Sequence, residues 1–333
     1  MKSKFKSLVM ATAVAGALIA ASVPAHAYVY AEADLNLRNL NIAVGTIGST
    51  GGFTAGSATI NSWTFTATNT ATLYGSSVVT SATCGIATAC GPTGSRLIPG
   101  AANGPGGSVV RGATDFTYYG PTGAGTFSNS TSALYTAELA GDPSTAGHTI
   151  AETNIATGTS SASANAEIKS TTSLSITFTA TGTNAFRLSF DADPATMASF
   201  HDVAGTKGSA LAQLQTSFKL RNNTTGTSAT WAPDGSNACT SLTWACVVSD
   251  GADLNHVSNQ GTNNGADDVY SRTTGWSPFT LLLTGLVNGP YTLTLDTLAS
   301  TDVTRVPEPA SLALMGLGLA ALGGFVARKR KQG

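Results

Sequence analysis

The chain has 333 residues, of which only 11% are charged, and its formal net charge at pH 7 is −1. Residues 28–305 carry 10 Lys and Arg against 17 Asp and Glu, a net charge of −7, and the basic residues are scattered singly. Because phosphate backbones are bound by clustered Lys and Arg, this pattern argues against nucleic acid as a partner. Abundant Thr, Ser and Gly favour strands joined by tight turns.

The first 27 residues have the composition of a secretory signal peptide. We therefore expect cleavage before Tyr28 and export of the mature chain, into a compartment where disulfides persist. The signature begins with the positive residues Lys2, Lys4 and Lys6 and continues with an apolar run over residues 8–21. It ends with a small-x-small cleavage site at Ala25, His26 and Ala27.

The mature chain begins with two alternations of apolar and polar residues, in opposite phase. The first ends at Leu37 and the second begins at Leu40. Because the side-chain period of a strand is two, one extra residue exchanges its inward and outward faces. The pattern predicts a β-bulge or a short break at Arg38-Asn39.

Residues 174–180 and 186–190 alternate cleanly on either side of the turn sequence 181–184, which predicts a β-hairpin. Residues 210–220 also alternate, which favours a strand, although the spacing of Leu211 and Leu214 permits a helix. By contrast, Gly and Pro recur throughout residues 82–130, which indicates long loops.

Near the end of the mature region, residues 279–284 and 291–295 read as strands that flank residues 287–290. The Asn288-Gly289 pair supports a turn between them, but Pro290 weakens a simple type I′ hairpin because it has no N–H for the ladder.

Four cysteines lie in the exported region, at Cys84, Cys90, Cys239 and Cys246. Local pairing is the natural one of three connectivities, so we expect disulfides 84–90 and 239–246 that act as structural staples. Their spacing is unlike that of a zinc ribbon.

The residues with potential chemistry do not form a known catalytic motif. His148, His201 and His256 are isolated among small or polar residues, and neither HExxH nor Gly-x-Ser-x-Gly occurs. We expect surface-loop histidines and a protein that is not an enzyme. A Ser-His-Asp arrangement made by the fold stays open, although no serine is singled out by the sequence.

Two binding hypotheses come from the C-terminal third of the mature chain. The first is a Ca²⁺ site, because carboxylate oxygens suit that ion and the alternative is a set of solvated turn residues; no other cofactor is expected. The second is a carbohydrate platform of exposed aromatic rings, with core packing as the alternative. The candidate residues are Asp250, Asp253, Asp267 and Asp268 for calcium, and Trp231, Trp244, Trp276 and Tyr270 for sugar.

The end of the chain combines a Pro-Glu-Pro tripeptide, an uncharged apolar run and a basic cluster. At ~1.5 Å per residue, a run of 18 residues gives roughly 27 Å of helix, enough to cross a hydrocarbon core. The positive-inside rule then keeps the cluster in the cytoplasm and the ectodomain beyond the inner membrane. These segments are Pro307, Glu308 and Pro309, then residues 310–327, then Arg328, Lys329, Arg330 and Lys331.

Together these features resemble the PEP-CTERM sorting tail, over residues 306–333 alone; an ordinary tail anchor is the alternative. In that family the membrane-embedded cysteine transpeptidase exosortase cuts near Pro-Glu-Pro and releases or transfers the ectodomain to the surface. The resemblance implies exosortase as a partner, an inner-membrane intermediate, and a bacterial surface or matrix role beside exopolysaccharide and biofilm.

The sequence thus predicts an all-β protein in three parts: a signal peptide (1–27), a jelly-roll-like β-sandwich ectodomain with loop insertions (28–305) and a sorting tail with a transmembrane helix (306–333). Residues 297–305 are expected to form a short stalk. The predicted function is an exported, structural surface protein associated with extracellular polysaccharide; a carbohydrate-binding module and a secreted hydrolase are the alternatives.

Overall fold

The computed structural model describes nine ranges of the chain, all of them within the predicted ectodomain except Val306. The described residues form strands, turns and loops without a helix. They are residues 28–48, 51–56, 58–85, 93–97, 126–134, 147–156, 164–202, 206–270 and 275–306.

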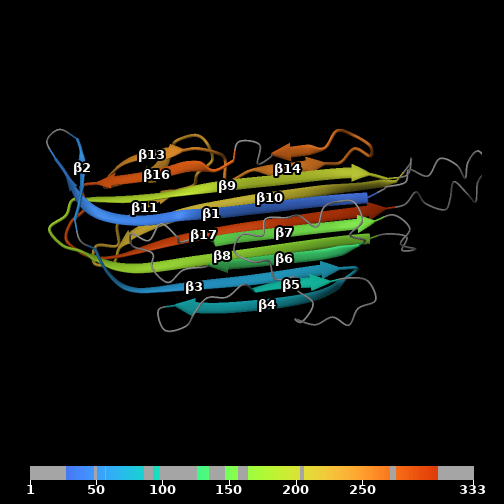
Figure 1. Cartoon of the computed structure of the whole chain (residues 1–333), viewed down its shortest axis with the longest axis horizontal. Coiled ribbons are helices and arrows are strands. Elements are labelled where there is room, and N and C mark those ends of the chain that lie inside the picture. Colours follow the sequence, from blue (N-terminus) through green and yellow to red (C-terminus); the bar gives the residue numbers. More distant parts are fainter. Residues whose placement is uncertain are drawn as a thin grey trace, which may run out of the picture.

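The strands form two antiparallel sheets, whose long members run side by side along the molecule in Figure 1. Sheet A is nine-stranded, in the order β13-β16-β9-β1-β7-β6-β5, with β2 paired to β1 and β15 paired to β9. Its strands are β13 (Ala245–Asp250), β16 (Ser277–Thr284), β9 (Ala185–His201), β1 (Tyr28–Ile47), β7 (Gly147–Ala156), β6 (Phe127–Leu134), β5 (Thr93–Leu97), β2 (Phe53–Ala55) and β15 (Asp268–Tyr270).

Sheet B is eight-stranded, in the order β12-β11-β10-β17-β8-β3-β4, with β14 paired to β10. Its strands are β12 (Cys239–Ser241), β11 (Ser228–Trp231), β10 (Lys207–Asn222), β17 (Gly289–Val306), β8 (Ala164–Ala180), β3 (Ala58–Leu73), β4 (Ser76–Gly85) and β14 (Val257–Gln260). The two sheets pack face to face as a sandwich, so the predicted all-β, two-sheet class is confirmed.

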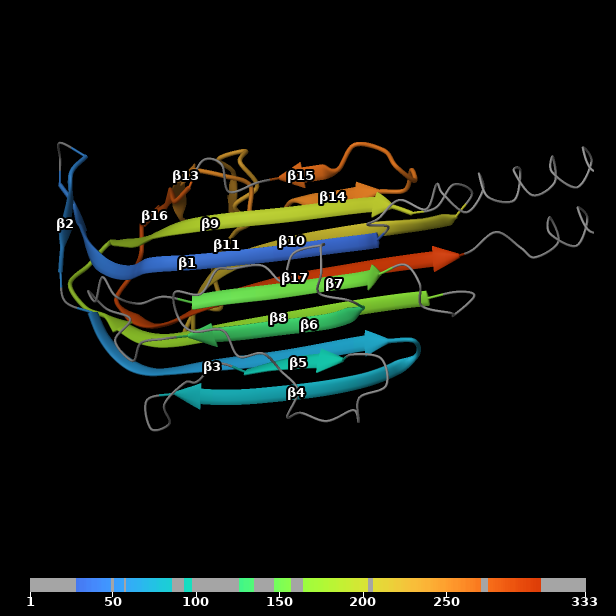
Figure 2. The ribbon, with the colours of Figure 1, turned by 45° about the vertical axis from the view of Figure 1, so that its right-hand side comes forward.

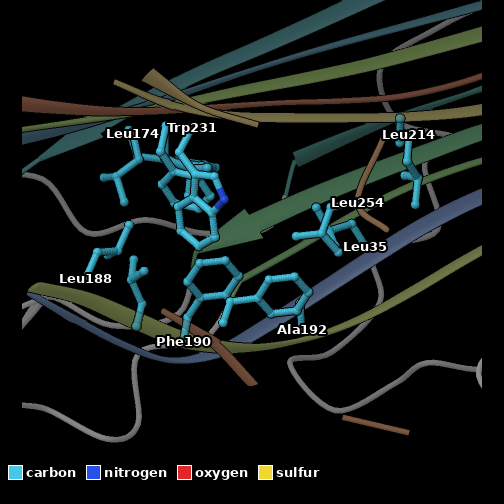
Figure 3. Packing of buried hydrophobic residues seen from close by; sticks show 14 of the residues in the cluster. Leu35, Leu174, Leu188, Phe190, Ala192, Leu214, Trp231 and Leu254 are labelled. Carbon is cyan, nitrogen blue, oxygen red and sulfur yellow. The ribbon is translucent and has the colours of Figure 1, made fainter. Parts of the chain in front are cut away.

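Strand alternation sends one face of each strand into the sandwich. In β17 the buried positions are the odd ones from Tyr291 to Arg305, and in β10 they are the even ones from Ala210 to Asn222. The predicted strand over 210–220 is therefore confirmed, and its helical alternative is wrong. The apolar residues among them join one core, part of which is shown in Figure 3.

The predicted hairpin around residues 181–184 is wrong, although both of its strands exist. β8 lies in sheet B, paired with β3 and β17, whereas β9 lies in sheet A, paired with β1 and β16. The turn is an arch between sheets, in which the inward faces meet: the Phe178 and Phe186 rings are 5.6 Å apart. Alternation predicts that each strand has an apolar face. Two such faces can be buried by packing against each other across the sandwich as well as by lying side by side in one sheet.

A second arch joins β16 in sheet A to β17 in sheet B, at the place where the sequence suggested a turn. The two arches are bonded to each other. The Gly285 and Leu286 N–H groups donate to the Asn184 carbonyl over 2.8 and 3.0 Å, and the Gly182 N–H donates to Asn288 Oδ1 over 2.8 Å. One end of the sandwich is thus closed by paired arches.

The predicted bulge in the first strand is confirmed. The register of β1 against β9 shifts between Arg38 and Asn41, and Asn39 has φ 55°. Its side chain donates to Asp191 Oδ2 over 2.7 Å, and Arg38 Nε donates to the same oxygen over 3.1 Å. β1 therefore continues as one strand of 20 residues through the change of phase.

The two-sheet sandwich is what the structure shows of the predicted fold, and its jelly-roll topology stays a prediction. Here β7, β8, β9 and β10 alternate between the two sheets. The arch at residues 181–184 contributes to this alternation, because it crosses between the layers and leaves the positions beside β8 and β9 to strands distant in sequence.

The disulfide between Cys239 and Cys246 is confirmed, with the two Cα atoms 6.5 Å apart, and it ties β12 to β13 across the sheet boundary. Cys84 is buried in β4 and is disulfide-bonded. Cys90, its predicted partner, lies outside the described residues.

An aromatic cluster fills the interior between β9 and β16 of sheet A and β8, β10, β11 and β17 of sheet B. Phe190 stacks on Phe279 at 4.9 Å and on Phe218 at 5.1 Å, and Phe218 stacks on Trp231 at 5.1 Å. Figure 3 shows Trp231 and Phe190 pointing toward each other from opposite sheets. The members are Phe178, Phe186, Phe190, Phe218, Trp231, Phe279 and Tyr291.

A hydroxyl cluster fills the interior between β6 and β7 of sheet A and β3, β8 and β17 of sheet B. Asn69 Nδ2 donates to Ser132 Oγ over 2.9 Å, Ser170 Oγ donates to Asn69 Oδ1 over 2.8 Å, and Thr153 Oγ1 donates to Thr301 Oγ1 over 3.1 Å. Each bond joins two strands. The members are Asn69, Ser132, Thr149, Thr153, Ser170, Thr172, Thr297 and Thr301.

Candidate functional site

Both ends of the mature region lie at the same end of the sandwich. The first residue of β1, Tyr28, is opposite His201 at the end of β9, and the last residue of β17, Val306, is opposite Lys207 at the start of β10. Figures 1 and 2 both place these four strand ends together. We call this end, with Tyr28, His201, Asp202, Arg305 and Val306, the sorting end.

The predicted stalk at residues 297–305 is wrong, because these residues are strand. β17 is paired with β10 up to Val306 and with β8 up to Arg305. The alternation of Thr297, Ala299, Thr301 and Val303, all buried, extends the inward face to the end of the strand. No stalk therefore separates the folded sandwich from Pro307.

A buried ion pair holds the last residues of this strand in place. Arg305 Nη2 lies 3.1 Å from Asp202 Oδ1, and Arg305 Nε donates to Asp202 Oδ2. The two side chains are 10% and 0% exposed. A bidentate pair of this kind is strong and directional, but either partner alone would leave an uncompensated buried charge.

An asparagine loop positions the aspartate of that pair. Asn263 Oδ1 accepts from the Asp202 N–H over 2.8 Å, and Asn264 Nδ2 donates to the Asp202 carbonyl over 3.0 Å. Asn264 has φ 56°, a conformation that Asn tolerates better than most residues, and its own N–H donates to the Phe200 carbonyl over 2.8 Å. The loop thus binds both the N–H and the carbonyl group of Asp202 and fixes its backbone.

Beside the pair lies a polar cluster that resembles a catalytic triad in composition only. Asp267 Oδ1 accepts from Ser199 Oγ and lies 2.8 Å from His201 Nε2, and the Tyr28 and His201 rings are 5.4 Å apart. A triad needs the histidine between the hydroxyl and the carboxylate. Here the carboxylate lies between the other two, so His201 cannot take a proton from Ser199 in this arrangement.

A second feature is a groove of about 450 Å³ on the outer face of sheet B. Its floor is formed by outward side chains of β3, β8, β17 and β10, and its wall includes Ala232 and Asn255. Asn255 is fixed there because its Oδ1 accepts from the Thr216 N–H over 3.0 Å. The side chains that project outward into the groove are Thr66, Thr68, Thr171, Ser173, Gln215, Ser217, Asp296 and Leu298.

Comparison with protein families matches residues 305–331 to the PEP-CTERM protein-sorting motif. The chain ends in a PEP-CTERM sorting tail. The motif implies an exported protein that exosortase processes at the membrane on its way to the cell surface. It begins at Arg305, so the folded sandwich and the sorting motif share the two residues Arg305 and Val306.

Comparison with curated proteins gave no match. Among solved structures, the Gx strain of infectious bursal disease virus is 12% identical, with 88% of this chain and 84% of that chain covered and a TM-score of 0.09. The VP2 subviral particle of infectious bursal disease virus is 11% identical, with 93% and 90% covered and a TM-score of 0.07. At these TM-scores the likeness carries no argument.

The cleavage and membrane predictions fall outside the described residues. This applies to Ala25 and Ala27 at the signal cleavage site, to Pro307, Glu308 and Pro309 of the PEP-CTERM tail, and to its basic residues from Arg328 to Lys331. Within the described part of the chain, no helix is long and apolar enough to cross a membrane.

Each of the four aspartates of the calcium hypothesis accepts local hydrogen bonds. Asp250 accepts from Trp231 Nε1 over 2.9 Å, and Asp268 accepts from the Asn259 N–H over 2.7 Å. Asp253 accepts from the Asn255 N–H, and Asp267 binds Ser199 and His201. Across the residues that the structure describes, no group of three or more His, Cys, Asp or Glu side chains could hold a metal ion.

The aromatic platform predicted for sugar binding does not exist as such. Trp231 and Trp244 are 1% and 5% exposed, so both belong to the core and that part of the prediction is wrong. Arg38 lies over the Trp276 ring at 4.2 Å. Tyr270 stacks on His256 at 4.2 Å, and burial, together with the nearby Asp253 carboxylate, raises the pKa of its hydroxyl.

Sequence reasoning missed a buried polar face on the outer side of sheet A. Glu32 of β1 is directly opposite Glu152 of β7, and both are buried. The Tyr30 hydroxyl donates to Glu32 Oε2 over 2.8 Å, and Asn36 Nδ2 donates to Asp34 Oδ1 over 3.1 Å. His148, predicted to lie in a surface loop, is buried in β7. In β1 these polar residues alternate with apolar ones, a pattern that predicts an exposed face, so the sequence did not indicate that they are buried.

Proposed function

We propose that the sandwich is a non-catalytic surface or extracellular-matrix protein, delivered by its PEP-CTERM tail, that binds extracellular polysaccharide through the groove on sheet B. The groove is the observation that carries the proposal. Its projecting side chains carry hydroxyl, amide and carboxyl groups, with a single large apolar residue, Leu298.

The lining suits a hydrated, hydroxyl-rich polymer. Sugars are bound by hydroxyl, amide and carboxylate groups, directly or through water, and water-mediated contacts are nearly as favourable as direct ones. Gln215 and Asp296 are exposed on the neighbouring strands β10 and β17. The next residue of each strand, Thr216 or Thr297, is buried on the opposite face of the sheet. Because β10 and β17 pair with each other along this whole stretch, the groups are held on a rigid surface.

The non-catalytic part of the proposal is supported by the histidine contacts. His201 and His256 bind Asp267 and Asp253, respectively, and neither contacts a Ser or Thr hydroxyl among the described hydrogen bonds. A general base must reach the proton that it removes. A secreted hydrolase would have to use residues outside these contacts, and turnover of a matrix polymer would support that alternative.

The test is a pull-down of the mature protein with exopolysaccharide from the producing bacterium. The double variant Gln215→Ala/Asp296→Ala should lose at least about tenfold in affinity, since two good polar contacts are each worth ~1 kcal/mol. Ser189→Ala, on the outer face of sheet A, is the control and should bind like the unmodified protein. Equal binding by all three proteins would reject the groove as the glycan site.

A further inference from the structure

At the sorting end, the last strand of the sandwich runs directly into the Pro-Glu-Pro sequence of the tail. The final strand pairs on both sides up to Arg305, Val306 still pairs with Lys207, and Pro307 is the next residue in the chain. An enzyme that cuts near Pro307 therefore meets a folded domain directly on the upstream side of its target.

We propose that Asp202 and Arg305 form a clamp that sets the upstream limit of processing. A paired strand cannot enter an active site, because its N–H and C=O groups are already bonded and its inward side chains are buried; it must first open locally. With the clamp closed, the chain up to Val306 stays in the sheet. Exosortase can then reach peptide bonds from Val306-Pro307 onward and no earlier ones.

The clamp is needed because strand ends fray. Opening costs least at the end of an element, where few contacts are lost. The bidentate Arg305–Asp202 pair adds a buried, charge-assisted contact one residue before the end of β17, and the Asn263 and Asn264 side chains hold Asp202 in place. The asparagine-rich loop thereby acquires a role that its sequence did not show.

Close approach of the two strands at the same point supports this assignment. Gly208 lies opposite Arg305, and a Cβ atom at Gly208 would be 2.2 Å from the Thr304 carbonyl oxygen, on the paired strand. Any side chain there would push β10 away from β17. The sequence thus keeps the last rungs of the ladder tight beside the ion pair.

Trypsin tests the clamp on the full-length protein in membranes, because trypsin cuts after Lys and Arg and Arg305 is itself such a site. In Asp202→Asn, cleavage after Arg305 should be at least about tenfold faster than in the unmodified protein. Cleavage after Arg221, an exposed residue of β10, reports opening of the whole sandwich and should not change. Equal rates after Arg305 would overturn the clamp, as would a parallel rise after Arg221.

Two further variants separate the clamp from a general loss of charge or folding. Asp267→Asn removes a carboxylate at the same end that binds Ser199 and His201, and it should leave cleavage after Arg305 unchanged. Gly208→Ala keeps the ion pair but opens the ladder, and it should accelerate the cut as Asp202→Asn does. A faster cut in Asp267→Asn, or an unchanged one in Gly208→Ala, would contradict the assignment.

The processing limit itself is read from the C-terminal residue of protein that the producing bacterium releases. Chains from the unmodified protein should end at Val306 or later, whereas Asp202→Asn should add chains that end between Thr301 and Arg305. Unmodified chains that end before Arg305, or identical ends in both proteins, would reject the clamp as the limit.

Discussion

The interior of the sandwich is filled in two different ways. The aromatic cluster packs stacked rings between β9 and β10, whereas the hydroxyl cluster joins β7 to β17 and β6 to β3 through side-chain hydrogen bonds. Burying rings is favourable without a specific partner, but a buried hydroxyl is tolerated only when it is bonded. The first cluster therefore supplies stability, and the second fixes which strands face each other.

The largest effect is expected from the aromatic cluster. Trp231→Ala should lower the free energy of unfolding by about 3–5 kcal/mol, because it removes a fully buried indole ring and leaves a cavity against Phe190 and Phe218. Urea unfolding of the mature protein measures the loss. Leu242→Ala, at a fully exposed position, is the control and should have almost no effect. Similar losses of stability in both variants would show that the aromatic cluster is not the main source of stability.

A smaller effect is expected from the centre of the hydroxyl cluster. Asn69→Ala should cost about 1–3 kcal/mol, since it leaves Ser132 and Ser170 without their amide partner in a buried site. Replacing all three, as Asn69→Leu/Ser132→Ala/Ser170→Ala, should recover most of that loss, because the two serine hydroxyls are then no longer buried without their amide partner. A triple variant less stable than Asn69→Ala would contradict this view of the cluster.

A bond at the margin of the hydroxyl cluster should matter least among the interior contacts. Thr153→Val and Thr301→Val each break the 3.1 Å bond that joins the two sheets, with little change of volume. We expect each to cost about 1 kcal/mol and the pair together to cost less than the sum. A double-mutant cycle from thermal unfolding measures the coupling, and strictly additive losses would show that the bond contributes nothing.

No effect is expected from added calcium. The aspartates of the calcium hypothesis are bonded to local groups and are not gathered into one site among the described residues. The melting temperature of the mature protein should therefore be the same in EDTA and in millimolar Ca²⁺. A rise of several degrees with Ca²⁺ would show a metal site and restore that hypothesis.

The contrast between the clusters explains what the sequence could predict. Alternating apolar residues located β8, β9, β10 and β17, and the change of phase located the bulge at Arg38-Asn39. The spacing of Cys239 and Cys246 predicted their disulfide, and the tail predicted the sorting motif. These features depend on residues that are near each other in the chain.

Partners distant in sequence were not predictable in the same way. Alternation says that Phe178 and Phe186 share a buried environment, but it does not say whether their strands pair in one sheet or face each other across two. Polar residues such as Asn69, Thr153 and Glu32 read as exposed, because their burial depends on strands far away in the chain. The candidate site was missed for this reason: nothing near Arg305 in the sequence points to Asp202.

The most direct test of this account is the intact mass of the protein recovered from the native extracellular matrix. We expect a chain that begins at Tyr28 and ends between Val306 and Pro309, so that a complete sandwich is released with no strand cut. A mass that includes residues up to Arg328 would contradict processing of the tail, and a chain that ends inside β17 would contradict a sandwich that stays closed up to its sorting signal.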